Sequence, residues 1–243
     1  MLKKIVSIWI ILLVSFAAHA DHVTIPKLYA PNIDGLVNAN GIGSYVDMLR
    51  ETLKREHVEI NVLPYSRALK LMISSKEPAC FFPGTFELAE SLNLPTTDLI
   101  QSIPFNTVYG KIAYLEKNNA FGSLQDLKGK SIVVRQGFPI PLEVQDLGVK
   151  FIAVKKLEDV YQMLKLGRAP YAYIHQPDMN IFYMSSGKQK LYEHQLKLET
   201  AGERFLCNAG AKKFVNYLNT EIEKLYQNGR IFGILHYTYT GLP

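Results

Sequence analysis

Aromatic and polar side chains recur near the ends of predicted strands in this sequence, a pattern typical of a site that binds a small molecule. Aromatic faces can cover flat or apolar ligand area and can hold a cation over the ring. An arginine at a strand end can bind an anionic group. Each aromatic residue has an alternative role in core packing, since aromatic residues in strands are commonly structural. The candidate ligand contacts are Tyr29, Tyr65, Phe82, Thr85, Glu90, Phe105, Arg135, Gly137, Phe138, Tyr173 and His175.

The same residue types give little support to catalysis. The sequence has no GxSxG or HExxH motif and no obvious pair of carboxylates, and His175 has no identifiable partner that would make it a general base. The two cysteines and six scattered histidines have no metal-binding spacing. We therefore predict a protein that is not an enzyme and that has no catalytic residue, metal site or cofactor.

The first half of the chain alternates strands and helices, as expected for a parallel sheet. Ser44 and Ser66 are the predicted N-caps of two helices, because a serine side chain can accept a hydrogen bond from the first helical turn. The strand that contains Cys80 is predicted to end at Pro83 and Gly84, which are turn formers. The predicted strands are 22–29, 58–63 and 80–82, and the first predicted helix is 44–55.

The second half repeats this alternation, so the predicted fold class is α/β. A long strand over 107–115 is predicted first, then a short helical turn and a buried strand over 131–135, and helices and strands follow in turn. The predicted strands are 107–115, 131–135, 151–154, 171–175 and 203–208, and the predicted helices are 124–127, 139–147, 157–166, 177–184, 212–228 and 231–237.

Two stretches, Ala68–Pro83 and Val160–His175, align without a gap. In each, an apolar-periodic helix is followed by a turn with Ser or Gly, a basic residue, a proline and a short aromatic strand. The repeat predicts two similar lobes that use the same unit. The alternative is a chance resemblance between two ordinary passages from helix to strand.

The first twenty residues have the pattern of a signal peptide. A positive start with Lys3 and Lys4 precedes an apolar stretch over 5–16 and the small-x-small sequence Ala18-His19-Ala20. We predict cleavage after Ala20 and export to the periplasm. The alternative is an uncleaved anchor, although the apolar stretch is short for a membrane span.

The composition indicates a globular protein of one large domain or two lobes. Of the 243 residues, 48% are hydrophobic and 20% are charged, with no low-complexity tract. The formal net charge of +5 is spread along the chain without a basic run, so no nucleic-acid partner is expected.

Cys80 and Cys207 are the only cysteines. An oxidising compartment would permit them to form a disulfide, which would join an early strand to the C-terminal part of the chain. The alternative is two buried thiols, because both lie in apolar strand-like runs and the sequence does not establish their distance in space.

Several short motifs occur in the order found in the type 2 periplasmic solute-binding proteins of extracellular family 3, and the chain resembles them over nearly all of the predicted mature length. In that family, two α/β lobes are joined by two crossing strands, and the ligand binds between the lobes. The resemblance implies that lobe 1 is 21–103 plus 207–243 and that lobe 2 is 104–206. The motifs are GSYVD at 43–47, PYSRAL at 64–69, FFPGT at 81–85, LQDLKGK at 124–130, VVRQG at 133–137, LKLGR at 164–168 and NTEIEKLYQNG at 219–229.

Four positions depart from the amino-acid binders of that family. The family's lobe 1 arginine, which holds the ligand carboxylate, falls on Glu90, and its lobe 2 aspartate, which takes the ligand amine, falls on His175. The acids that commonly precede the two strands are replaced by Pro78 and Pro170. We therefore expect a ring-bearing or partly apolar solute, or a cation if Glu90 turns inward, and not a standard zwitterionic amino acid.

The resemblance implies a monomeric binding protein that closes its lobes on a small solute. Its partner would be an ABC permease or a membrane sensor. Two alternatives remain open at this point: a dehydratase-like periplasmic enzyme of the same fold, and a sensory module that binds a protein partner.

Overall fold

The computed structural model describes residues 23–33, 35–138, 140–175, 191–194, 198–199 and 202–239. The predicted signal peptide, its cleavage site after Ala20 and the predicted helix 177–184 lie outside these residues. Within the described ranges, every helix is too short or too polar to cross a bilayer.

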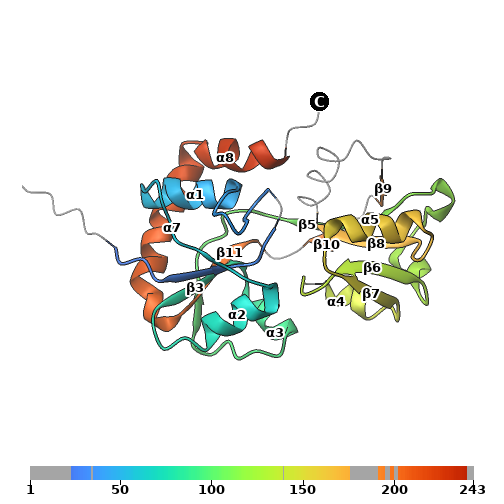
Figure 1. Ribbon diagram of the computed structural model, residues 1–243, viewed down its shortest axis with the longest axis horizontal. Coiled ribbons are helices and arrows are strands. Elements are labelled where there is room, and N and C mark those ends of the chain that lie inside the picture. Colours follow the sequence, from blue (N-terminus) through green and yellow to red (C-terminus); the bar gives the residue numbers. More distant parts are fainter. Residues whose placement is uncertain are drawn as a thin grey trace, which may run out of the picture.

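One sheet lies in the lobe on the left of Figure 1 and combines early and late parts of the chain. Its order is β2-β1-β3-β11-β4. The first three of these strands are parallel, whereas β11 runs antiparallel to both of its neighbours. The strands are β1 (Lys27–Ala30), β2 (Asn61–Val62), β3 (Ala79–Gly84), β4 (Leu99–Gln101) and β11 (Arg204–Asn208).

The second sheet lies in the other lobe (Figure 1) and has the order β10-β5-β8-β6-β7, with β9 paired to β5. Here β6, β7 and β8 are parallel and β5 is antiparallel to β8. Read in reverse, as β7-β6-β8-β5-β10, the second sheet has the same succession of parallel and antiparallel strands as the first sheet, β2-β1-β3-β11-β4. The strands are β5 (Tyr109–Tyr114), β6 (Ser131–Arg135), β7 (Lys150–Val154), β8 (Tyr171–His175), β9 (Tyr192–Glu193) and β10 (Leu198–Glu199).

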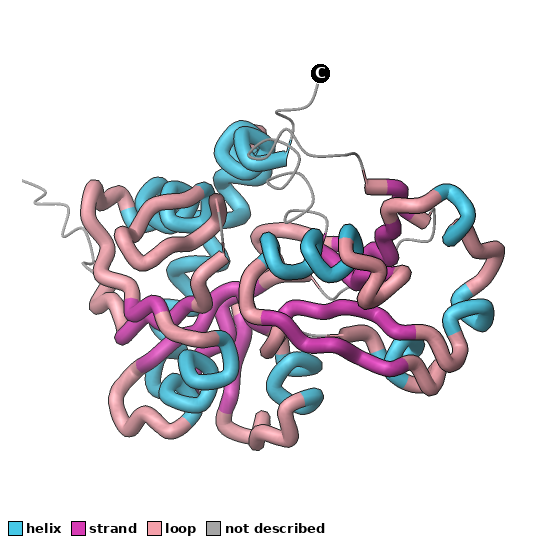
Figure 2. Tube along the Cα trace, turned by 45° about the vertical axis from the view of Figure 1, so that its right-hand side comes forward, coloured by secondary structure: helices cyan, strands magenta, loops and turns pink. Residues whose placement is uncertain are grey.

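Helices cover both faces of the first sheet (Figure 2). The side chains of β3 alternate, so that Cys80 and Phe82 belong to one core with α1 and α7, while Ala79 and Phe81 belong to another with α2. A strand buried on both faces reads as a continuous apolar run, which explains the sequence ACFF. The helices are α1 (Ser44–Leu53), α2 (Tyr65–Ile73), α3 (Phe86–Ser91), α7 (Lys212–Gln227) and α8 (Arg230–Tyr239).

The second sheet is also covered on both faces. Val133, Ala172 and Ile174 pack with the helix α5, whereas Val134 and Tyr173 face α4 and a short 3-10 turn. The helical elements of this lobe are α4 (Leu142–Gln145), α5 (Leu157–Lys165), η1 (Lys117–Asn119) and η2 (Leu124–Leu127), and η3 (Ala209–Ala211) follows β11 in the first lobe.

The structure confirms the repeated unit. Helix α2 leads into β3, and α5 leads into β8 at the corresponding positions of the alignment. Both strands occupy the centre of their sheets, with a parallel strand on one side and an antiparallel strand on the other. The two lobes therefore use the same helix–turn–strand unit in the same place.

Both predicted serine caps are wrong by one or two residues. The N-caps are Gly43 and Pro64, so Ser44 and Ser66 are already helical. Gly43 has a φ of 137°, and a Cβ atom there would overlap the backbone carbonyl of Leu36. Only glycine fits the backbone conformation at the entry to α1. Gly43 is therefore the N-cap, and Ser44 is the first helical residue.

Other elements differ in length or were not predicted. Strand β3 continues through Pro83 and Gly84, where a turn was predicted, and the helix predicted over 139–147 is only the single turn α4. The elements α3, β4, β9 and β10 were not predicted. Thr85 begins α3 by accepting a hydrogen bond from the backbone N–H of Leu88 at 3.2 Å.

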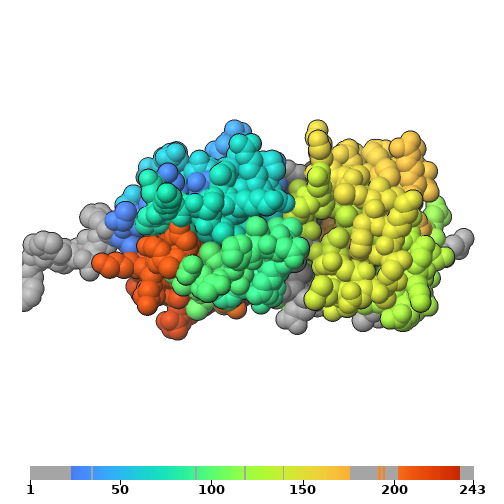
Figure 3. Space-filling view, turned by 90° about the horizontal axis from the view of Figure 1, so that it is seen from below, coloured from blue at the N-terminus to red at the C-terminus, as the bar shows by residue number. Residues whose placement is uncertain are grey.

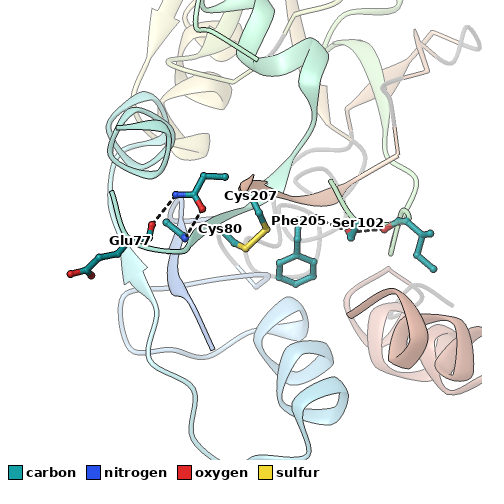
Figure 4. Close-up of a disulfide and its surroundings, with 8 residues drawn as sticks. Glu77, Cys80, Ser102, Phe205 and Cys207 are labelled. Atoms are coloured by element: carbon teal, nitrogen blue, oxygen red, sulfur yellow. Dashed lines mark hydrogen bonds between the residues drawn. A yellow bond between two sulfur atoms is a disulfide. The ribbon is translucent and has the colours of Figure 1, made fainter. Parts of the chain in front are cut away.

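Cys80 and Cys207 form a disulfide between the neighbouring strands β3 and β11, where they are direct cross-strand partners (Figure 4). Both are fully buried. Asn208, next to the disulfide, donates to the carbonyl of Glu77 at 2.8 Å and accepts from the N–H of Ala79 at 3.2 Å. The late strand is thus tied to the early one by covalent and polar contacts, which decides between the two alternatives for these cysteines.

Candidate functional site

A pocket lies where two parallel strands, β6 and β8, end. Arg135 is the last residue of β6 and His175 the last of β8, and both line it. Its empty volume is about 250 Å³, which includes space open to solvent. Ligands of open α/β sheets commonly bind at the carboxyl ends of parallel strands. The lining residues are Val134, Arg135, Phe138, Ile140, Leu157, Tyr173, Ile174 and His175.

The ring of Phe138 contacts two of the other side chains that line this pocket. The guanidinium carbon of Arg135 lies 4.1 Å from the centre of its ring. The His175 ring lies 5.8 Å from the same ring, and the Tyr173 and His175 rings are 5.3 Å apart. The structure therefore brings together four of the residues predicted from the sequence.

The loop after β6 reaches the other lobe. The Phe138 ring lies 5.1 Å from the ring of Tyr65, the first residue of α2. Gly137 has a φ of 83°, and a Cβ atom there would lie 3.3 Å from the Cβ of Tyr65. In Figure 3 the surfaces of the two lobes meet side by side. The structure is thus a state in which the lobes are in contact beside the pocket.

Tyr65 is held firmly on the side of the first lobe. Its hydroxyl donates to the carbonyl of Pro83 at 3.2 Å, and its ring packs 5.2 Å from that of Phe81. Burial raises the pKa of Tyr65, and the carboxylate of Glu203 raises it further. The phenol is therefore neutral at physiological pH. The half-buried Tyr29 packs against the same cluster.

Tyr173 is 4% exposed, and its hydroxyl has no hydrogen-bond partner among the residues that the structure describes. The hydroxyl lies over Gly110, where any Cβ atom would overlap it. Burial raises the pKa of Tyr173, with a further contribution from the carboxylate of Glu143. The hydroxyl therefore keeps its proton and can act as a donor.

Phe82 and Phe105 do not join this site. Both are fully buried, and their rings lie 4.9 and 5.3 Å from that of Phe205 in the core beneath α1. Phe82 faces that core because its neighbour Phe81 takes the opposite face of β3, beside Tyr65. Glu90 is exposed on α3. In this state of the molecule, the alternative role in core packing holds for both phenylalanines.

The aliphatic lining residues, Val134, Ile140, Leu157 and Ile174, were not predicted. Leu157 is the first residue of α5, as Tyr65 is of α2, and extending the sequence repeat toward its N-terminal side aligns the two. That extension would have identified Leu157 from the sequence. For metals, no group of three or more His, Cys, Asp or Glu side chains suited to an ion occurs in the described ranges.

Known structures share this architecture at low sequence identity. An ancestral arginine-binding protein bound to glutamine is 17% identical, with a TM-score of 0.69 over 89% of this chain and 99% of that one. The GluR0 ligand-binding core from Nostoc punctiforme, in complex with L-glutamate, is 16% identical with a TM-score of 0.70, over 88% and 99%.

A further match is an arginine 3rd transport system periplasmic binding protein from Legionella pneumophila. It is 14% identical with a TM-score of 0.66, over 89% of this chain and all of that one. No protein-family model matches the sequence, and no curated protein matches it either. With two similar sheets, chain crossings between them and these structural matches, the chain has the two-lobe type 2 periplasmic binding protein fold.

Proposed function

We propose that this protein is a periplasmic solute-binding protein of family 3 that closes its two lobes on a small ligand. The observation that carries the proposal is the contact of Phe138 with Tyr65 across the lobes, beside a pocket at the ends of β6 and β8. A ligand that touches both lobes favours closure, and the closed shape is what a transporter or sensor can recognise.

The proposed ligand contacts come from both lobes. The residues that line the pocket belong to the second lobe, and Tyr65 with its first-lobe neighbours would supply the facing wall through its contact with Phe138. Phe82 and Phe105 are left out because they are buried, and Glu90 because it is exposed on α3. The proposed contacts are Tyr29, Tyr65, Thr85, Arg135, Gly137, Phe138, Tyr173 and His175.

The solute is not a standard zwitterionic amino acid under this proposal. The structural matches bind arginine, glutamine or glutamate according to their descriptions. In this chain, the family positions for the carboxylate and the amine carry Glu90 and His175. Aromatic rings at the site favour a ring-bearing or partly apolar solute instead.

The remaining parts of the proposal follow from the resemblance. We propose cleavage after Ala20, a monomeric mature protein in the periplasm, and delivery of the solute to an ABC permease or a membrane sensor. The proposed lobes are 21–103 with 207–243, and 104–206. Strand β11 begins at Arg204 and pairs with the first sheet throughout, so 204–206 belong with lobe 1 and the proposed boundary moves from 206 to 203.

Native mass spectrometry of the protein purified from the periplasm tests this function. We expect a co-purified small molecule that is lost on mild unfolding, and a radius of gyration in solution that increases when the molecule is removed. Absence of any bound species, with no thermal shift across a broad metabolite panel, would contradict a solute-binding function. Turnover of the co-purified molecule would instead identify an enzyme.

A further inference from the structure

We propose that the second lobe binds an anionic group of the solute, so that the ligand is a ring-bearing carboxylate held by Arg135, His175 and Tyr173. This inference rests on the proposed function and specifies its substrate class. It reverses the arrangement of the amino-acid binders that the chain resembles, in which an arginine of the first lobe holds the carboxylate.

The first argument is the charge of the pocket. Arg135 and His175 end two adjacent parallel strands, and Arg135 is charged at every physiological pH. None of the described residues that line the pocket is acidic. A guanidinium at a strand end matches the geometry of a carboxylate, with two parallel hydrogen bonds.

The second argument is the buried hydroxyl of Tyr173. A buried polar group without a partner is costly, and most such groups in native proteins are hydrogen-bonded. This hydroxyl lies over Gly110, whose cross-strand partner is His175. A ligand oxygen near His175 would therefore give the phenol the acceptor that the described residues do not provide.

The third argument is the position of the rings. Phe138 lies between Arg135 on one side and Tyr65 of the first lobe on the other. A ligand whose acidic group reaches Arg135 would place its remaining atoms against these aromatic faces. Flat or cyclic apolar groups gain the most from such surfaces.

Binding of matched probes tests the substrate class. The probes are benzoate, phenylacetate, 3-phenylpropionate and cyclohexanecarboxylate, each compared with its amide and with the corresponding amine. Thermal shift and calorimetry on the ligand-stripped protein should detect binding of at least one carboxylate and of none of its neutral or cationic counterparts. Equal binding of an amide, or preference for an amine, overturns the inference.

Three variants assign the binding to these side chains. Arg135→Gln and Tyr173→Phe should each lower carboxylate affinity, the first by roughly tenfold or more, as expected for a lost hydrogen bond to a charged group. Tyr173→Phe should leave the melting temperature of the ligand-free protein unchanged or higher, because it removes a hydroxyl without a described partner.

Glu143→Gln should tighten carboxylate binding, since the negative charge of Glu143 acts on Tyr173.

Arg168→Gln is the matched control, because Arg168 is exposed in the turn before β8, at the opposite end of that strand. It should bind the carboxylate like the unchanged protein. Equal affinity in Arg135→Gln and Arg168→Gln overturns the inference. So does weaker carboxylate binding in Glu143→Gln, because the loss of a negative charge near the pocket should not weaken the binding of an anion there. A co-purified neutral or cationic solute overturns the substrate class but leaves the proposed function intact. The absence of any co-purified solute, together with no thermal shift by any probe or panel metabolite, contradicts both.

Discussion

At the scale of single residues, Phe138 has contacts that no other described side chain of the site combines. Its ring meets Arg135 and His175 of its own lobe and Tyr65 of the other. Phe138→Ala should weaken ligand binding by roughly tenfold or more, because it removes aromatic contact area and part of the contact between the lobes. Isothermal titration with the co-purified solute measures this.

Leu142→Ala is the control for Phe138→Ala. Leu142 begins the next helix, α4, and is 69% exposed, so its loss removes apolar area without touching the site. We expect unchanged affinity and a nearly unchanged melting temperature in this variant, whereas Phe138→Ala should also lower the melting temperature, because its half-buried ring packs against Tyr65. If the two variants bound the solute equally well, Phe138 would have no part in binding.

Gly43 shows how one residue can fix the start of a helix. Gly43→Ala should lower the free energy of unfolding by roughly 3 kcal/mol or more, since backbone strain adds to overlap with Leu36. Gly41→Ala, in the same loop and also at positive φ, has open space around its Cβ position and should cost only about 1 kcal/mol. Urea denaturation distinguishes the two, and equal losses would refute the steric explanation.

Half of the residues that line the pocket, namely Arg135, Phe138, Tyr173 and His175, could be recognised from residue types alone. Arg135, Tyr173 and His175 end or lie near the ends of strands whose bounds the sequence defines well, so their convergence follows from the parallel sheet. The choice between Phe81 and Phe82 could not be made. Both lie in one apolar run that is buried on both faces. In such a run no alternation of polar and apolar residues shows which face of the sheet each side chain takes.

At the scale of elements, the agreement is best where the strands are central and apolar. Strands β6 and β8 have the predicted bounds because short runs of β-branched and aromatic residues end at turn formers. Strand β4 and helix α3 were missed because both are short, and because α3 follows directly on β3, where a turn was predicted. Their formation depends on neighbours in space: β4 pairs with β11, about a hundred residues later in the chain.

The disulfide between β3 and β11 stabilises the first sheet. Replacing Cys80 and Cys207 together by alanine should lower the free energy of unfolding by about 2–4 kcal/mol, the usual effect of a bridge that closes a long loop. Urea denaturation of the oxidised protein and of the double variant provides the comparison. Addition of a reductant should reduce the stability of the unchanged protein under denaturing conditions and leave the variant unaffected. Equal stability of the two proteins would contradict a stabilising role.

At the scale of the whole molecule, three side chains link the first lobe to the segments that cross between the sheets. Asn106, before β5, donates hydrogen bonds of 2.8 Å to Tyr45 of α1 and to Glu203, before β11. The Tyr45 hydroxyl also donates to the Glu203 carboxylate. Backbone hydrogen bonds join the same two segments, from the N–H of Glu203 to Asn106 at 2.8 Å and from Phe105 to Glu203 at 2.9 Å. Under the proposed function these two segments would form the hinge, and their attachment to the first lobe would fix the direction in which the second lobe can move.

Glu203→Gln should therefore change the balance between open and closed lobes. A neutral amide accepts weaker hydrogen bonds than a carboxylate, so the hinge loses part of what holds it in the state with touching lobes. We expect a larger radius of gyration for the ligand-free variant by small-angle scattering, and a dissociation constant that rises in proportion to the lost closed population.

Glu221→Gln is the control, since Glu221 is 8% exposed and accepts a hydrogen bond from Lys224 at 2.6 Å within α7. It removes an equally well bonded carboxylate away from the crossing segments, so stability should fall without a change in the radius of gyration. An equal change in both variants would mean that the Glu203 contacts stabilise the first lobe and do not control its closure.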